Sequence, residues 1–329
     1  MRVRRSAERD PLRDSVVVIT GASSGFGRGA ALAFANAGAT VVLGARRKEV
    51  LEDVARECEA AGAMAVVIET DVSDAVEVSR LAQAAVERFG RIDVWVNNAG
   101  AGAIGRFDEI PLEDHVQVVE TTLLGTLYGS YIALRQFRRQ GRGTLINMGS
   151  IAGKVAAPFY ASYVAAKHGV VGLSAALRKE LEQDGEEAGD IHVCTVLPDA
   201  HDTPFFQHAA NYSGHEVVPP PPVHDPTEVV EAIVSLALDP TRDETIVGAA
   251  GKASAATARV SRAAAEAMMS RAHGRQMEAP LAPPSEGSLT RPSPIGTGVT
   301  GGWKEKEKEE KQGKRTRRRP SARAGRPEV

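Results

Sequence analysis

The first two-thirds of the chain alternate between short apolar runs and longer segments rich in Ala, Leu, Glu and Arg. Each short run places apolar, often β-branched residues at consecutive positions. Such runs are typical of strands buried on both faces of a parallel sheet. The pattern therefore predicts about seven buried strands, the last weaker than the others, at residues 16–20, 40–44, 65–69, 94–97, 144–148, 192–197 and 245–247.

The segments between these strands have the length and composition of helices. We predict helices at residues 25–36, 48–61, 74–89, 112–138, 160–183 and 226–238. Regular alternation of strands and helices indicates an α/β, doubly wound parallel sheet with helices on both faces, that is, a Rossmann fold. Such a sheet binds ligands outside the carboxyl ends of its strands, where the strand order reverses. We expect this domain over residues 14–252, after a flexible N-terminus of residues 1–13.

The composition changes toward the C-terminus. The Ala-rich stretch 253–273 predicts one more helix, and we assign residues 253–278 to it. From residue 279 the chain is rich in Pro, Gly, Ser and Thr, and residues 304–329 hold 11 basic and 5 acidic side chains. Such a segment buries too little apolar surface to offset the entropy of ordering. We therefore predict a disordered basic tail over residues 279–329. Its arginines at 315–319 could contact nucleic acid, but a solvated, non-specific tail is favoured.

Charge and cysteine content exclude several classes of protein. The 40 basic and 42 acidic residues give a net charge of -2, so no overall field favours nucleic acid or membrane. Cys58 and Cys194 lie far apart, which fits buried reduced thiols and predicts no metal site. No apolar run approaches the roughly 18 residues that span a bilayer, and no apolar segment follows the basic start. We expect a soluble, cytoplasmic protein.

The first strand leads into a glycine-rich turn and then a helix. The string is Thr20-Gly-Ala-Ser-Ser-Gly-Phe-Gly27, with the spacing T-G-x-x-x-G-x-G. Glycines allow a tight turn and close approach of the backbone to a pyrophosphate, and the helix N-terminus offers free N–H groups. The candidate cofactor-binding residues here are Gly21, Ser23, Ser24, Gly25, Phe26 and Gly27.

A second group of residues suggests acid/base chemistry. Ser150 follows the strand at 144–148, and Tyr163 and Lys167 lie four residues apart in the predicted helix 160–183. Residues at i and i+4 share one face of a helix. A nearby ammonium favours the phenolate, so we expect Lys167 to lower the pKa of Tyr163. Ser150 would hold the substrate oxygen, and Tyr163 would exchange its proton with that oxygen.

Together these motifs resemble the short-chain dehydrogenase/reductase family over about residues 14–250. Further matches are Asn97-Asn-Ala-Gly100 after the fourth strand and Asp71-Val72 after the third. The resemblance implies that the cofactor lies against Asp71, Val72, Asn98, Ala99, Gly100, Pro198 and Thr203, and that Tyr163 and Lys167 also contact it, Lys167 at the nicotinamide ribose.

The end of the second strand indicates which cofactor is bound. Sites for NAD place an acidic residue there to bind the ribose 2′-hydroxyl. This chain instead has Arg46 and Arg47 and no carboxylate. Guanidinium groups bind phosphate through several donors. We therefore predict NADP(H), as in the NADP-preferring branch of the family, although Arg47 could simply begin a solvated helix.

Two positions depart from the family pattern. Thr122 stands where many members have an Asn that bends the helix and holds a water linked to the Lys. A Thr hydroxyl can bond a carbonyl or a water, so we include Thr122 among the catalytic candidates and expect a relay with some loss. Asp199 replaces the Gly that follows Pro198, a position where a non-Gly residue would not enter positive φ freely.

The resulting prediction is an NADP(H)-dependent oxidoreductase that moves a hydride between nicotinamide and a carbonyl or secondary alcohol. Aromatic and aliphatic residues of the loop 204–225 predict a largely apolar substrate, although they could equally only pack the loop on the domain. A catalytically weak NADP-binding regulatory or scaffold protein is the alternative. A Ser/His/Asp hydrolase using His201, Asp202 or His208 is disfavoured because no G-x-S-x-G string exists. Helices 112–138 and 160–183 resemble those with which the family forms dimers, so we expect a homodimer or homotetramer.

Overall fold

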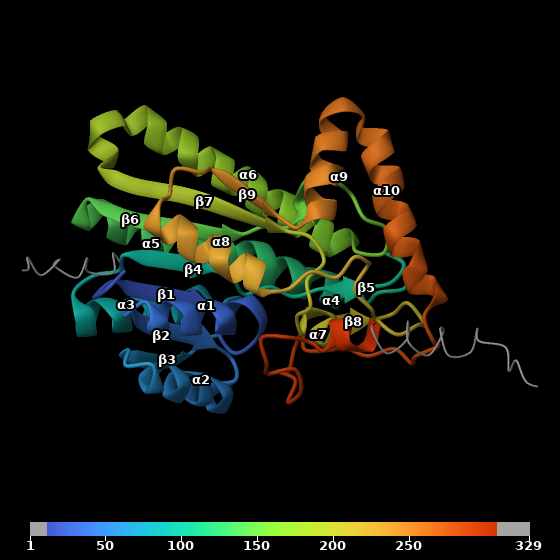
Figure 1. Cartoon of the computed structure of the whole chain (residues 1–329), viewed down its shortest axis with the longest axis horizontal. Helices are drawn as coiled ribbons and strands as arrows, with labels where there is room; N and C mark the ends of the chain where they lie inside the picture. Colours follow the sequence, from blue (N-terminus) through green and yellow to red (C-terminus); the bar gives the residue numbers. More distant parts are fainter. Residues whose placement is uncertain (1–11, 308–329) are drawn as a thin grey trace, which may run out of the picture.

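A seven-stranded parallel sheet forms the centre of the molecule (Figure 1). The computed structural model describes residues 12–307, except for the side chains of residues 275 and 276. The sheet order is β3-β2-β1-β4-β6-β7-β9, so the strand order reverses between β1 and β4. The predicted fold is confirmed. The strands are β1 (Val16–Thr20), β2 (Thr40–Ala45), β3 (Ala65–Glu69), β4 (Val94–Asn97), β6 (Arg142–Met148), β7 (Asp190–Pro198) and β9 (Glu244–Val247).

Helices cover both faces of the sheet, because alternate residues of each strand point to opposite faces. Val17 and Ile19 of β1 lie in the apolar cluster shared with α1 (Gly25–Asn36), α2 (Lys48–Ala60) and α8 (Thr227–Leu238). Val16 and Val18 lie in the cluster shared with α3 (Ala75–Phe89), α5 (Gly125–Gln140) and α6 (Ala161–Asp184). Both free cysteines are buried, as predicted. Among the described residues, no helix combines the length and apolarity needed to cross a membrane.

Short elements lie beyond the carboxyl ends of the strands. The strands β5 (Ala103–Ile104) and β8 (Ala210–Asn211) pair in parallel, and α7 (Phe205–His208) precedes β8. Three single turns, η2 (Ile151–Gly153), η3 (Gly185–Ala188) and η4 (Arg275–Glu278), are 3₁₀ helices. The helix predicted at 112–138 is α4 (Leu112–Val119), a π turn η1 (Glu120–Leu124) and α5 in succession.

The prediction of one C-terminal helix was wrong. Residues 249–274 form two helices, α9 (Ala249–Val260) and α10 (Arg262–Gly274), which pack as a hairpin (Figure 1). The break falls at Ser261, whose φ of -151° and ψ of 106° are extended. Its hydroxyl accepts a hydrogen bond from the Ala264 N–H at 3.2 Å, so Ser261 caps α10. The predicted boundary at 252/253 therefore falls inside α9.

The structure also differs from the predicted tail. Residues 279–307 follow a defined path on the domain: Ser285 bridges to Asn211, Leu281 bridges to His215, and Leu289 is buried. Composition suggested disorder because the segment has few apolar side chains, but backbone hydrogen bonds to the domain order it. Residues 308–329, including the arginines at 315–319, lie outside the described residues, as do residues 1–11. Leu12, assigned to the flexible N-terminus, is buried in the core.

Candidate active site

A cavity of about 480 Å³ opens at the carboxyl ends of the strands, next to the point where the strand order reverses. It receives residues from the loops after β1, β2, β3, β4, β6 and β7 and from α6 and α10. The structure brings nearly all the predicted site residues to this cavity. Those that line it are Gly21, Ser23, Ser24, Gly25, Phe26, Arg46, Arg47, Asp71, Val72, Asn98, Ala99, Gly100, Ser150, Tyr163, Lys167, Pro198 and Thr203.

The glycine motif forms a cradle without side chains after β1. Gly21 has φ +66°, and a Cβ there would come within 2.8 Å of the Ala99 Cα. A Cβ on Gly27 would collide with the Gly21 carbonyl oxygen and the Asn98 amide. Asn98 fixes the turn, since its Nδ2 donates to the carbonyl oxygens of Thr20 at 3.0 Å and Gly21 at 3.2 Å. A cradle that only glycine fits, ahead of a helix N-terminus, suits a pyrophosphate.

Arg46 and Arg47 lie at the end of β2, at the edge of the cavity. Arg47 donates through Nε and Nη2 to the Ser23 hydroxyl, at 3.2 and 3.0 Å. Burial and the neighbouring Arg46 lower the pKa of Arg47. The Asp71 carboxylate lies 3.8 Å from Arg46 and accepts hydrogen bonds from the Ser73 N–H and hydroxyl. The end of β2 thus carries two guanidinium groups, and the fold brings the Asp71 carboxylate, which follows β3, close to one of them.

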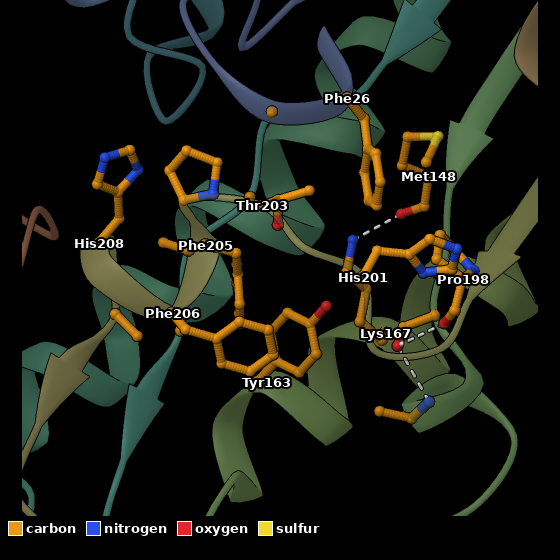
Figure 2. Close-up of a pocket in the computed structure, with 18 of the residues that line it drawn as sticks. Phe26, Met148, Tyr163, Lys167, Pro198, His201, Thr203, Phe205, Phe206 and His208 are labelled. Carbon is orange, nitrogen blue, oxygen red and sulfur yellow. Dashed lines mark hydrogen bonds between the residues drawn. The ribbon is translucent and has the colours of Figure 1, made fainter. Parts of the chain in front are cut away.

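Ser150, Tyr163 and Lys167 line the same cavity, and Figure 2 shows Tyr163 and Lys167 close together in it. Ser150 begins the turn η2: its hydroxyl accepts from the Ala152 N–H at 3.1 Å and also bonds Tyr163. Tyr163 and Lys167 project from one face of α6. The Lys167 ammonium lies 5.7 Å from the centroid of the Tyr163 ring and donates to the Met148 carbonyl oxygen at 2.6 Å.

Burial shifts the pKa values of Tyr163 and Lys167 in opposite directions. It raises the pKa of Tyr163 to about 12, although the hydrogen bond from Ser150 acts to lower it. It lowers the pKa of Lys167 to about 8. The pKa of Tyr163 is therefore raised in the protein alone, contrary to the expected lowering, because desolvation disfavours the phenolate. The phenol is protonated at neutral pH.

Comparison with known proteins identifies the family. The family described as short chain dehydrogenase matches residues 15–212. The chain belongs to this family. A Bacillus subtilis (strain 168) protein described as an uncharacterized oxidoreductase, YxnA, is 33% identical over 287 residues, which cover 84% of this chain and 78% of that protein. A 3-oxoacyl-[acyl-carrier-protein] reductase of a Synechocystis species is 33% identical over 230 residues, 70% of this chain and 91% of that one.

Solved structures of short chain dehydrogenases have the same fold. An alcohol dehydrogenase of the archaeon Thermococcus sibiricus, complexed with 5-hydroxy-NADP, superposes with a TM-score of 0.62 at 29% identity, covering 71% of this chain and 96% of that one. A Burkholderia phymatum family member in complex with NAD gives a TM-score of 0.67 at 26% identity, covering 78% and 96%. The protein is thus an oxidoreductase of the short chain dehydrogenase family.

Thr122 takes a different position from the other catalytic candidates. It lies in the π turn η1, is fully buried and does not line the cavity. Its hydroxyl accepts from the Ala101 N–H at 3.0 Å and donates to the Ala101 carbonyl oxygen at 3.1 Å. The helix is therefore interrupted at the residue where the family has its Asn. The role of Thr122 in a proton relay stays a prediction.

Asp199 occupies its position without backbone strain. Among the described non-glycine residues only Asp14 and Phe159 have positive φ, so the position does not require glycine. The Asp199 carboxylate accepts from the Gly251 N–H at 2.9 Å and lies 3.4 Å from His201 and 3.5 Å from His224. Burial raises the pKa of Asp199 and lowers that of His201.

The hydrolase candidates have structural partners. The Asp202 carboxylate accepts hydrogen bonds from the Gly301, Trp303 and Lys304 N–H groups. The His208 imidazole bonds the Ile295 carbonyl oxygen at 3.0 Å. Residues of the C-terminal segment therefore bond two of the three candidate side chains, Asp202 and His208, whereas His201 lies against Asp199.

The substrate end of the cavity is formed partly by the predicted loop and partly by α10. The Phe205 ring is tilted by 50° against the Tyr163 ring, with centroids 5.2 Å apart. Phe206 and the prolines at 220–222 also line the cavity. Tyr212 does not line it; its hydroxyl donates to Asp114 at 2.5 Å. The sequence did not indicate the α10 contribution, because an Ala-rich helix gives no sign of which face it buries. The α10 residues that line the cavity are Met268, Met269, Ala272 and His273.

Proposed function

We propose that the protein is an NADP(H)-dependent oxidoreductase that interconverts a carbonyl and a secondary alcohol, with Tyr163 as the general acid/base. The convergence of Ser150, Tyr163 and Lys167 at one end of a cavity whose other end is the glycine cradle carries this proposal. One cavity can therefore hold a dinucleotide and present its reactive end to a proton donor.

The residues of the cavity fit an NADP(H) cofactor. The glycine cradle and the N-terminus of α1 would hold the pyrophosphate, and Arg46 would hold the ribose 2′-phosphate. Asp71 and Val72 would border the adenine, and Lys167 would contact the nicotinamide ribose. When bound, the nicotinamide supplies or accepts the hydride.

The chain's own residues perform the proton chemistry. The Ser150 hydroxyl holds the substrate oxygen, and the Tyr163 phenol, protonated at neutral pH, donates its proton to that oxygen during reduction. The Lys167 ammonium, 5.7 Å from the ring, stabilises the phenolate that this transfer leaves. Loss of the proton from buried Tyr163 is costly without such a charge, so the acid role of Tyr163 depends on the Lys167 ammonium.

The cavity supports an apolar substrate. Phe205 and Phe206 cover one side of Tyr163, and Met268 and Met269 of α10 complete the apolar wall. A few polar groups within apolar walls are typical of sites for small organic molecules. The names of the Thermococcus alcohol dehydrogenase and the Synechocystis 3-oxoacyl reductase place alcohol and carbonyl chemistry among this chain's relatives.

A panel of apolar ketones and aldehydes tests the function. Wild type should consume NADPH with at least one of them, and Tyr163→Phe should lower kcat by about 10²–10⁴-fold, the usual contribution of a general acid. Tyr160→Phe is the matched control, since Tyr160 lines the same cavity one helical turn earlier; it should retain turnover. Equal rates in wild type and Tyr163→Phe would reject the mechanism.

The same assay with NADH tests the cofactor assignment. A charge-assisted hydrogen bond stabilises by about 1.5–3 kcal/mol, so Arg46→Ala should reduce the NADPH/NADH preference by about ten- to hundredfold. Arg56→Ala, an exposed arginine on α2 paired with Asp53, should leave the ratio unchanged. A parallel loss of both cofactors in Arg46→Ala would show that Arg46 does not read the phosphate.

A further inference from the structure

The chain crosses its own cofactor cavity near its C-terminus. We call residues 286–304 the C-terminal strap. Figure 1 shows it in red, passing beside α7 toward the loops that follow β1 and β2. The family match ends at residue 212, so the strap is not among the residues that match the family. Its contacts run from the end of β2 to the loop after β7.

At the end of β2 the strap binds the two arginines of the cofactor site. Arg46 donates to three strap carbonyl oxygens, at 2.5, 2.8 and 3.5 Å, and Arg47 donates to two more, at 3.0 and 3.2 Å. The accepting carbonyls belong to residues 288, 289, 290, 293 and 295. The guanidinium groups that would read a 2′-phosphate thus also hold the strap.

In its middle the strap touches the glycine motif. The Gly25 N–H donates to the Gly298 carbonyl oxygen at 2.9 Å, and Arg28 donates to the Thr297 carbonyl oxygen at 2.7 Å. Gly25 is the first residue of α1, whose N-terminus faces the proposed pyrophosphate position. The strap therefore lies along the outer rim of the phosphate cradle.

At its far end the strap is fastened to the loop that follows β7. The Asp202 carboxylate accepts from three successive parts of the strap, the N–H groups of residues 301, 303 and 304, at 2.8–3.3 Å. The Trp303 indole donates to the Thr203 carbonyl oxygen at 3.0 Å and packs edge-on against Phe206 at 6.3 Å. Thr203 and Phe206 both line the cavity.

The cavity lies between the strap and the domain. Ser288, Pro292 and Ser293 of the strap line one side, and the glycine motif lines the other. A dinucleotide in this cavity would be enclosed along its adenosine and pyrophosphate half. It could not leave past that rim while the strap holds its contacts.

The strap is anchored at its ends and lightly held between them. Leu289 is 1% exposed, whereas Ile295 in the middle is 61% exposed. The middle is held by hydrogen bonds from arginines and a backbone N–H, and water can solvate these groups once the strap lifts. Lifting the middle requires no loss of a large apolar contact, so the strap can open without unfolding the domain.

We propose that the C-terminal strap is a retaining lid for the dinucleotide: it must lift for the cofactor to enter or leave, and it closes over the bound cofactor through Arg46 and Arg47. The proposal rests on the proposed function in so far as the cavity binds NADP(H). Its distinctive consequence is slow cofactor exchange, which is independent of turnover.

Release of NADPH measures this directly. NADPH bound to the protein is chased with excess NADP⁺ in a stopped-flow instrument, with the nicotinamide fluorescence excited directly. A chain ending at Ser285 should release NADPH at least tenfold faster than the full chain. A chain ending at Glu307, which keeps the strap, is the matched control and should release it at the full-chain rate.

A point variant covers the case in which the shorter chain does not fold. Trp303→Ala removes the far anchor but leaves Leu289 in place, and should also speed release. Ile295→Ala changes an exposed strap residue whose backbone contacts persist, and it should not speed release.

Release rates equal to wild type in Trp303→Ala and in a folded chain ending at Ser285 would overturn the lid while leaving the cofactor assignment intact. If NADPH binds only after the strap is removed, the strap blocks the cofactor from entering, and the proposal that it retains bound cofactor is overturned. Failure of every form to bind NADPH would overturn both proposals.

Discussion

Burial determines which proton state the reactive side chains hold. Tyr163, with a pKa raised to about 12, is a phenol across the physiological range, whereas Lys167, with a pKa lowered to about 8, is close to titration. Both shifts have the same cause, the cost of a charge in a poorly hydrated site. The sequence places the two groups on one helix face, but their spacing alone does not give the size of that cost.

The Lys167 pKa predicts a pH limit for reduction. The ammonium is present below pH 8 and is lost as the pH rises through that value, and only the charged form stabilises the Tyr163 phenolate. The kcat/KM for reduction should therefore be level below about pH 8 and fall above it. Initial rates between pH 6.5 and 10 measure this decrease in kcat/KM. The Arg side chain in Lys167→Arg stays charged over the whole range, so any activity of that variant should not decrease above pH 8. The same decrease in Lys167→Arg would show that another group causes it.

At the scale of elements, local interruptions place the helices around the site. The π turn η1 separates α4 from α5 at Thr122, and the Ser261 cap separates α9 from α10. The second break folds α10 back so that it lines the substrate end. Asp199 fixes the start of this hairpin, because its carboxylate bonds the N–H of Gly251 in the first turn of α9.

Removing that carboxylate should loosen the α9–α10 hairpin. Loss of a side-chain acceptor at a helix N-terminus costs about 0.5–2 kcal/mol, so Asp199→Ala should lower the free energy of unfolding by that amount and raise KM for the substrate more than it changes kcat. Asp199→Asn, which keeps an acceptor, is the matched comparison and should be milder. Urea denaturation and steady-state kinetics measure the two effects. An unchanged stability in Asp199→Ala would contradict the capping role.

At the scale of the whole molecule, one face of the domain presents apolar side chains on successive helices. Leu112 and Val116 of α4 and Leu127 and Tyr131 of α5 are each at least 40% exposed. Each pair is spaced at i and i+4, so each lies on one face of its helix. Patches of this kind mark protein interaction sites, which supports the homodimer or homotetramer expected from these helices.

Light scattering in solution tests the assembly. Wild type should have the mass of two or four chains, and the double variant Leu127→Asp/Tyr131→Asp should have a smaller mass, because two carboxylates would have to be desolvated in the contact. Val260→Asp, at a more exposed apolar position on α9, should leave the mass unchanged. A monomeric wild type would contradict the expectation.

The strand and helix pattern could be predicted because buried parallel strands require consecutive apolar residues, and the sequence shows them directly. β1, β3 and β4 have the predicted bounds, and the others differ by a few residues at their ends. The site residues could be predicted for a related reason: each motif follows a strand, and parallel strands bring their carboxyl ends to one edge. Gly21, Arg46, Ser150 and Tyr163 therefore meet in one cavity although they are far apart in the chain.

The sequence by itself therefore determined the sheet, the glycine cradle and the candidate acid/base residues, because those depend on local patterns and on the edge that parallel strands share. Only the tertiary structure decided the rest. The strap and α10 reach the cavity through long-range contacts made largely by backbone groups, which composition does not record. The pKa values of Tyr163 and Lys167 depend on how fully the surrounding chain excludes water. Arg46 illustrates both contributions. The sequence predicted it as a phosphate-binding residue, and only the tertiary structure shows that it also binds the chain's own C-terminal strap.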